Sequence, residues 1–98
     1  MSADPADALA ALRARVDHID TDIVRLLADR QNAVDAIAAV KRAHAIRAHD
    51  EARESDILAA ALQEAARLGV APEVVEDVLR AILKHSRARV VGAADLQR

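Results

Sequence analysis

The stretch LAALRARVDHIDTDIVRLLADRQNAVDAIAAVK, residues 9–41, decides the fold of this chain. Its large aliphatic side chains recur at steps of mostly three or four residues, at Leu9, Leu12, Val16, Ile19, Ile23, Leu26, Val34 and Ile37. That spacing is typical of one face of an α-helix. Nothing in the stretch breaks a helix, so a single helix of over 30 residues, about 50 Å long, is predicted. A helix kinked at its middle is the alternative.

A helix of this length is longer than a compact monomer of 98 residues needs. It must therefore find partners for its apolar stripe along its whole length, and a second copy of the chain is the simplest source. The sequence predicts an intertwined homodimer without a stable monomer.

Two cations interrupt the apolar stripe of this helix. Arg30 follows Leu26 by four residues, and Lys41 follows Ile37 by four. On a helical wheel both fall within the roughly 80° arc of the stripe. A buried cation is costly unless it is paired, and the stripe holds no acid beside them, so we expect an anion to arrive from outside. The alternative is a pair of side chains that extend to the surface or meet acids elsewhere.

The rest of the chain predicts two shorter helices. Residues 42–49 should form a loop, Asp50 should cap a second helix that runs to about residue 68, and Gly69 should close it. The expected inner face of the second helix is Ile57, Leu58, Ala61, Leu62 and Ala65.

Pro72 should begin the third helix and Gly92 should end it. Its expected stripe is Val75, Val78, Leu79, Ile82, Leu83, Ser86 and Val90. The predicted fold class is therefore all-α, with three helices in a single domain over residues 1–98. Its core covers about residues 7–91, and residues 92–98 are expected to form a flexible tail.

Composition excludes several classes of function. The formal charge is −2 and the chain has no aromatic residue, which argues against a nucleic-acid partner. There is no Cys and the four His show no metal-ligand spacing, so we expect surface imidazoles and no metal or cofactor. No apolar run reaches the ~20 residues of a membrane span, and a cytoplasmic protein without a membrane partner is expected.

Polar residues at inward positions carry the expected chemistry. Glu54 precedes Ile57 and Leu58 by three and four residues, so it should lean onto the inner face, with Arg53 beside it. An ordinary solvated first turn is the alternative for this pair. Ser86 lies on the third stripe, where a hydroxyl can also simply bond to a carbonyl of the preceding turn.

These residues resemble the all-helical (AroQ) class of chorismate mutases. The resemblance rests on LRARVDHID at residues 12–20, LLADR at 26–30, Lys41, DEARE at 50–54 and Ser86, and it covers about residues 7–91. It implies an intertwined homodimer in which Arg13 enters the partner's active site. It also implies an isomerase that converts chorismate to prephenate by a pericyclic rearrangement, without metal or cofactor. The pathway implied is the shikimate route to Phe and Tyr. Another enzyme of that pathway is a candidate binding partner under this resemblance.

By this resemblance, Lys41, Arg30 and Glu54 are the catalytic groups. Lys41 would bond the ether oxygen whose bond breaks, and Glu54 would hold the ring hydroxyl together with the backbone of Asp50. The residues expected to bind substrate are Arg13, Arg30, Lys41, Asp50, Arg53, Glu54, Ser86 and Val90.

Val90 departs from the family pattern, which usually has Gln or Glu four residues after the serine. Valine cannot donate a hydrogen bond, so the ether oxygen would rely on Lys41 alone. A weak mutase, a relative with another substrate and a shifted register are all compatible with this departure. Gln97 would share the face of Ser86 only if the helix continued past Gly92.

Two other readings remain open. One is a same-fold enzyme, such as an isochorismate pyruvate lyase or a 4-amino-4-deoxychorismate mutase, against which Arg53 and Glu54 argue. The other is a non-catalytic helical dimer or regulatory module, which would leave Arg30 and Lys41 unexplained.

Overall fold

The computed structural model describes residues 4–95, with side chains described up to residue 91. Three helices occupy this range: α1 (Pro5–Ala43), α2 (Glu51–Leu68) and α3 (Pro72–Asp95). No strand occurs among the residues described, so the predicted all-α class is confirmed. Over that same range, no helix is both long enough and apolar enough to cross a lipid bilayer.

The first helix is longer than the sequence pattern required. α1 is a single α-helix of 39 residues, which confirms the prediction of more than 30. It starts at Pro5, where the missing N–H of proline costs no hydrogen bond. The carboxylate of Asp4 accepts a bond from the Ala6 N–H at 2.9 Å and so caps the first turn.

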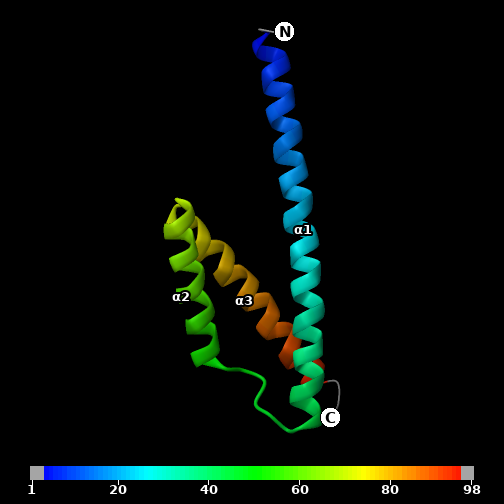
Figure 1. Ribbon diagram of the computed structural model, residues 1–98. Coiled ribbons are helices and arrows are strands. Elements are labelled where there is room, and N and C mark those ends of the chain that lie inside the picture. The colour runs from blue at the N-terminus through cyan, green and yellow to red at the C-terminus, as the bar shows by residue number, and fades with distance from the viewer. Residues whose placement is uncertain (1–3, 96–98) are drawn as a thin grey trace. The chain divides into compact units, whose positions relative to one another are not determined.

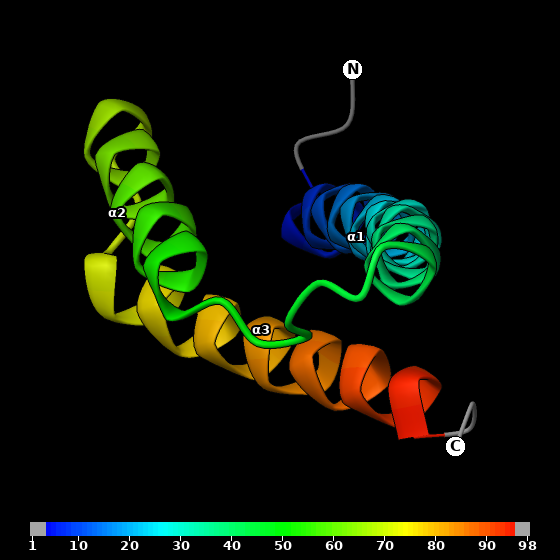
Figure 2. The ribbon, with the colours of Figure 1, turned by 90° about the horizontal axis from the view of Figure 1, so that it is seen from below.

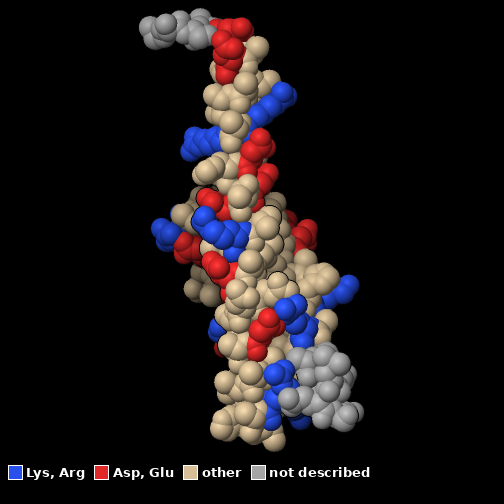
Figure 3. Space-filling model, turned by 90° about the vertical axis from the view of Figure 1, so that its right-hand side faces the viewer, with Lys and Arg blue, Asp and Glu red and all other residues tan. Residues whose placement is uncertain are grey.

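The described residues fall into two units whose boundary lies within α1, between Ala33 and Val34. In the first unit, the stripe from Leu9 to Leu26 is about half exposed, with values between 46% and 59% for its six aliphatic side chains. An apolar row of this length facing water is expected of a surface that another molecule covers. Figure 3 shows acidic and basic side chains interspersed over the face that it presents.

The second unit contains the buried residues. α2 and α3 run in opposite directions, meet at the turn after α2 and move apart from it (Figures 1 and 2). The buried apolar side chains among those described are Ala38, Ala65, Leu83 and Val90. The inner face predicted for α2 is buried or half-buried throughout. The stripe predicted for α3 is confirmed except at Val78, which is half exposed.

Polar contacts fix the ends of these helices. Asp50 caps α2 by accepting the Arg53 N–H at 3.0 Å, as predicted. Gly69 closes α2 with φ 73°, in the left-handed region that glycine adopts at low cost, and Val70 N–H donates to Ala65 O at 2.9 Å. Ala45 also lies in this region, with φ 53°, in the segment between α1 and α2.

One predicted boundary is wrong. Gly92 does not end the third helix, because α3 continues to Asp95, and so residues 93–95 are not an irregular tail. Glycine inside a helix costs only about 1 kcal/mol, and two alanines, the strongest helix formers, follow it. Residues 96–98, which include Gln97, lie outside the described part of the chain.

An ion pair between Arg89 and Asp35 joins α3 to the part of α1 that belongs to the second unit. Arg89 donates to Asp35 through two nitrogens, and the distance from Nη2 to Oδ2 is 2.8 Å. The pKa of the Asp35 carboxyl is lowered, chiefly by its hydrogen bond from Arg89. This two-point contact links the C-terminal half of α3 to Asp35 of α1.

Candidate active site

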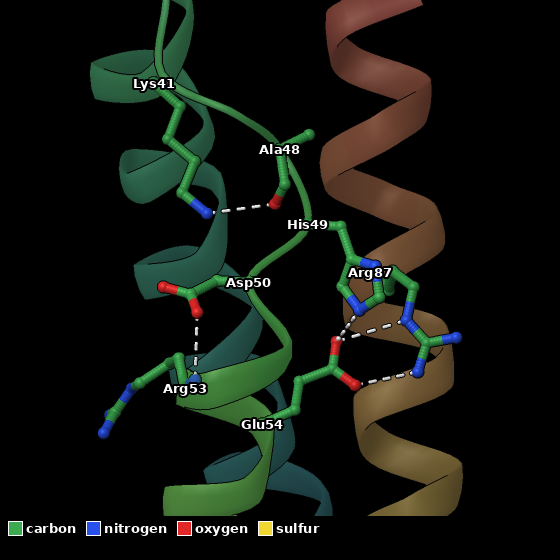
Figure 4. Close-up of polar contacts among 7 residues, drawn as sticks. All are labelled: Lys41, Ala48, His49, Asp50, Arg53, Glu54 and Arg87. Atoms are coloured by element: carbon green, nitrogen blue, oxygen red, sulfur yellow. Dashed lines mark hydrogen bonds and ion pairs between the residues drawn. The ribbon is translucent and has the colours of Figure 1, made fainter.

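Polar groups from α1, α2, α3 and the segment before α2 come together in the second unit (Figure 4). They are Lys41, His49, Asp50, Glu54 and Arg87. Three of the five are residues that the sequence pattern singled out. The other two, His49 and Arg87, were not assigned any role.

Lys41 lies in the last turn of α1 and is half-buried. The chain turns back after the helix, with Ile46 N–H donating to Lys41 O at 2.8 Å. This turn brings the carbonyl of Ala48 to the lysine, and Nζ donates to it at 3.0 Å. The ammonium is therefore held in place by a neutral acceptor, and its charge is not cancelled by a carboxylate in that contact.

A pocket of about 440 Å³ opens beside this lysine. Its volume suits a small organic ligand. The lining contains two cations and two acids, so a ligand there meets charges of both signs. The residues that line it are Lys41, Ile46, Arg47, His49, Asp50 and Glu51.

Asp50 is the N-cap of α2, and Arg53 lies in the first turn of this helix. The Asp50 carboxylate accepts the capping bond described above, and the resemblance assigns the backbone of Asp50 to the ligand. The Arg53 side chain is exposed and extends away from Glu54 in Figure 4. An exposed guanidinium has the reach to turn toward an incoming carboxylate.

Glu54 is the most extensively bonded acid of the site. Arg87 Nε donates to its Oε2 at 3.1 Å, and Arg87 Nη2 donates to its Oε1 at 2.8 Å. Its side chain is 23% exposed. The hydrogen bond from Arg87 is the largest cause that lowers the pKa of Glu54, and His49 lowers it further. This carboxyl therefore stays ionised well into the acidic range and accepts hydrogen bonds without donating them.

His49 keeps 36% of its side chain exposed, and it also contacts this carboxylate, which the prediction of a surface imidazole did not include. Its Nε2 lies 3.1 Å from Glu54 Oε2, which makes an ion pair when the ring is protonated. The approach is not aligned as a hydrogen bond, and Nε2 is shielded from solvent. The imidazole thus adds a charge contact that depends on its protonation.

Sequence reasoning missed Arg87 because it lies outside the apolar stripe of α3. The available signal was its position in the sequence, directly after the candidate residue Ser86. A guanidinium at the edge of a stripe has the length to reach a carboxylate on a neighbouring helix. Periodicity counts only side chains that point inward, so it does not detect such contacts.

Ser86 and Val90 both lie on the inner face of α3. Ser86 is half-buried, and its Oγ donates to Ile82 O at 2.9 Å, the bond to the preceding turn that was the alternative to a substrate role. Val90 is 8% exposed and belongs to the core of the second unit.

Arg13 and Arg30 lie on the first unit, and the other candidate residues belong to the second unit. Arg13 is exposed, whereas Arg30 is half-buried. The predicted set is thus divided, with two arginines on residues 4–33 and the other six positions on the second unit.

The chain is similar in sequence to curated proteins of other organisms. The chain is 37% identical over 78 residues to the T-protein of Enterobacter agglomerans, covering 80% of this chain and 21% of that one. It is 33% identical over 82 residues to the T-protein of Haemophilus influenzae, covering 84% of this chain and 22% of the relative. The chain therefore spans about a fifth of the length of these curated relatives.

The sequence family described as chorismate mutase type II matches residues 12–91. This range includes both candidate arginines of the first unit, Arg13 and Arg30, and every polar residue that lines the pocket. It also covers the greater part of all three helices. The chain belongs to the chorismate mutase type II family, the all-helical class of these enzymes.

Proposed function

We propose that the protein is a chorismate mutase, an isomerase that rearranges chorismate to prephenate on the route to phenylalanine and tyrosine. The observation that carries the proposal is the position of Lys41. Its ammonium lines a pocket that also holds Asp50, and it donates a hydrogen bond to the neutral carbonyl of Ala48. A cation held in this way is available to a developing negative charge.

The reaction needs no covalent step from the protein. Chorismate reacts only in a compact form, and binding both of its carboxylates to arginines holds that form and reduces the entropy lost on the way to the transition state. Arg13, Arg30 and Arg53 are the cations proposed for this, with Ser86 assisting. As the C–O bond lengthens, the ether oxygen gains charge, and Lys41 stabilises that charge more than it stabilises the ground state. Glu54 receives the ring hydroxyl.

The proposal is tested by following the loss of chorismate absorbance with the purified protein and identifying prephenate as the product. Isochorismate and 4-amino-4-deoxychorismate serve as parallel substrates. Conversion of chorismate alone, or much faster than the others, supports the proposal. Turnover of one of the others in its place would assign the protein to a different reaction of the same fold.

We further propose that the active protein is a homodimer in which α1 of each chain covers the exposed stripe of the other. Sedimentation at micromolar concentration should give twice the chain mass of 10.5 kDa. Ile19→Asp places a charge on the stripe and should give a monomer. Asn32→Asp places the same charge about half a turn away from the stripe, and it should leave the dimer intact. A monomeric mass for the unaltered protein would contradict the proposal.

Val90→Gln tests whether the missing donor limits catalysis. If it does, the amide should raise kcat, because a donor to the developing oxyanion is worth ~2.7–4 kcal/mol. Val90 is buried, so an amide without a partner there would cost about 1–3 kcal/mol of stability. Thermal unfolding is therefore measured beside kcat. Val91→Gln, at the adjacent exposed position, is the matched control, and an equal kcat in both variants would mean that the donor is not limiting.

A further inference from the structure

We propose that Arg87 is a positioning residue, which fixes the plane of the Glu54 carboxylate so that it can receive the substrate's ring hydroxyl. This inference rests on the proposed function, and it adds a residue to which the resemblance gives no role. Arg87 acts through Glu54 and is not itself expected to touch the substrate.

The geometry of the contact supports this role. The guanidinium meets the carboxylate with two parallel bonds, of 3.1 and 2.8 Å, one to each oxygen. A two-point contact of this kind sets the direction of the carboxylate as well as its distance. Each carboxylate oxygen keeps acceptor capacity after receiving one bond, so Glu54 can still accept a hydroxyl. The contact also spans 33 residues of sequence, from α3 to the first turn of α2.

The charges around Glu54 support the same conclusion. Arg87 faces it from α3, and His49 faces it from the segment before α2. The pKa of Arg87 is raised, chiefly by its hydrogen bond to Glu54 and to a smaller extent by the charge of Glu51, one turn earlier on α2. Of the two groups that face Glu54, only Arg87 is charged at every pH of interest, because a guanidinium does not lose its proton in proteins. Arg87 therefore keeps the acceptor ionised whatever the state of the imidazole.

The chain offers a matched control in Arg89. This residue lies two positions further on α3 and makes the same kind of two-point bond, to Asp35 instead of Glu54. The two arginine side chains are almost equally exposed, at 43% and 45%. Replacing either arginine removes one ion pair between α3 and another helix. Only the replacement of Arg87 leaves Glu54 without its guanidinium partner.

The experiment compares Arg87→Gln, Arg87→Lys and Arg89→Gln. We expect kcat/KM to fall roughly tenfold in Arg87→Gln, the factor that one charge-assisted hydrogen bond is worth, and to stay near the unaltered value in Arg89→Gln. Arg87→Lys keeps the charge but not the planar fork, so it should recover part of the loss.

The pH profile separates positioning from a purely structural role. Arg87 depresses the pKa of Glu54, so its removal lets that pKa rise toward the ordinary value of 4.5. The ionised form is then lost at a higher pH as the solution is acidified, and the acidic limb of kcat/KM should move upward in Arg87→Gln. In Arg87→Lys the limb should move less, and in Arg89→Gln it should not move.

A carbon NMR titration of the Glu54 carboxyl in the absence of substrate keeps the inference separate from the proposed function. Equal titration midpoints in the unaltered protein and Arg87→Gln would overturn the inference whether or not the protein acts on chorismate. If chorismate is converted and Arg87→Gln matches the unaltered protein in rate and pH profile, the inference fails while the function stands. A faster Arg87→Gln would mean that Arg87 competes with the substrate, and it would also overturn the inference.

Discussion

Lys41→Ala should lose chorismate turnover almost completely while the helices and the dimer remain intact. The ammonium is required where the ether oxygen becomes negative, and removing a preorganised donor of this kind typically lowers kcat by about 10²–10³-fold. Its loss also removes the bond to Ala48 O, which is worth only about 1 kcal/mol of stability. Steady-state kinetics, circular dichroism and sedimentation of the same sample test both parts of this expectation.

The matched control is Lys84→Ala. Lys84 is the second lysine of the chain, and its side chain is exposed on α3. Both variants change the net charge by the same amount, so a general effect of charge on substrate attraction would appear in both. Near-normal activity in Lys41→Ala would end the assignment of this residue to the ether oxygen.

Mixed dimers of Arg13→Ala and Arg30→Ala chains should regain about half of the activity per dimer, although each variant alone is inactive. The two arginines are 17 residues apart on α1, about 25 Å along a straight helix. Two side chains of one helix cannot both grip one small dianion across that distance. Arg13 should therefore serve the site of the partner chain.

In such a heterodimer, sharing places both substitutions in one site and leaves the other site complete. Differently tagged chains allow the heterodimer to be isolated and its composition verified before the assay. The control is the Arg13→Ala homodimer, which carries one substitution in each active site and should stay inactive. Heterodimers that are verified and remain inactive would contradict the shared site.

The sequence predicted the helices well because their limits depend on local chemistry. Asp50, Gly69 and Pro72 each act within one turn, through a cap, a left-handed residue and a fixed φ, and the structure has all three as expected. Gly92 misled the prediction, since glycine weakens a helix without ending it when alanines follow.

The site was predictable in part for the same reason. Lys41 and Glu54 stand out because charged residues interrupt or adjoin an apolar pattern, and the structure brings both into one region. Arg87 and His49 join them through contacts that depend on how α3 and the segment before α2 meet the start of α2. Such contacts follow from tertiary geometry, which spacing along the chain does not encode.

Arg87 and Arg89 each make a two-point bond from α3, and the strength of these bonds should depend on ionic strength. Both guanidinium groups are roughly half exposed, so mobile ions reach them and screen their attraction to Glu54 and Asp35. Exposed pairs of this kind add about 0–1 kcal/mol to stability, and less when salt is high. The apolar core around Leu83 and Ala65 does not respond to dissolved ions in this way. Moderate salt should therefore loosen the orientation of α3's charged groups well before it loosens the packing of α3 itself.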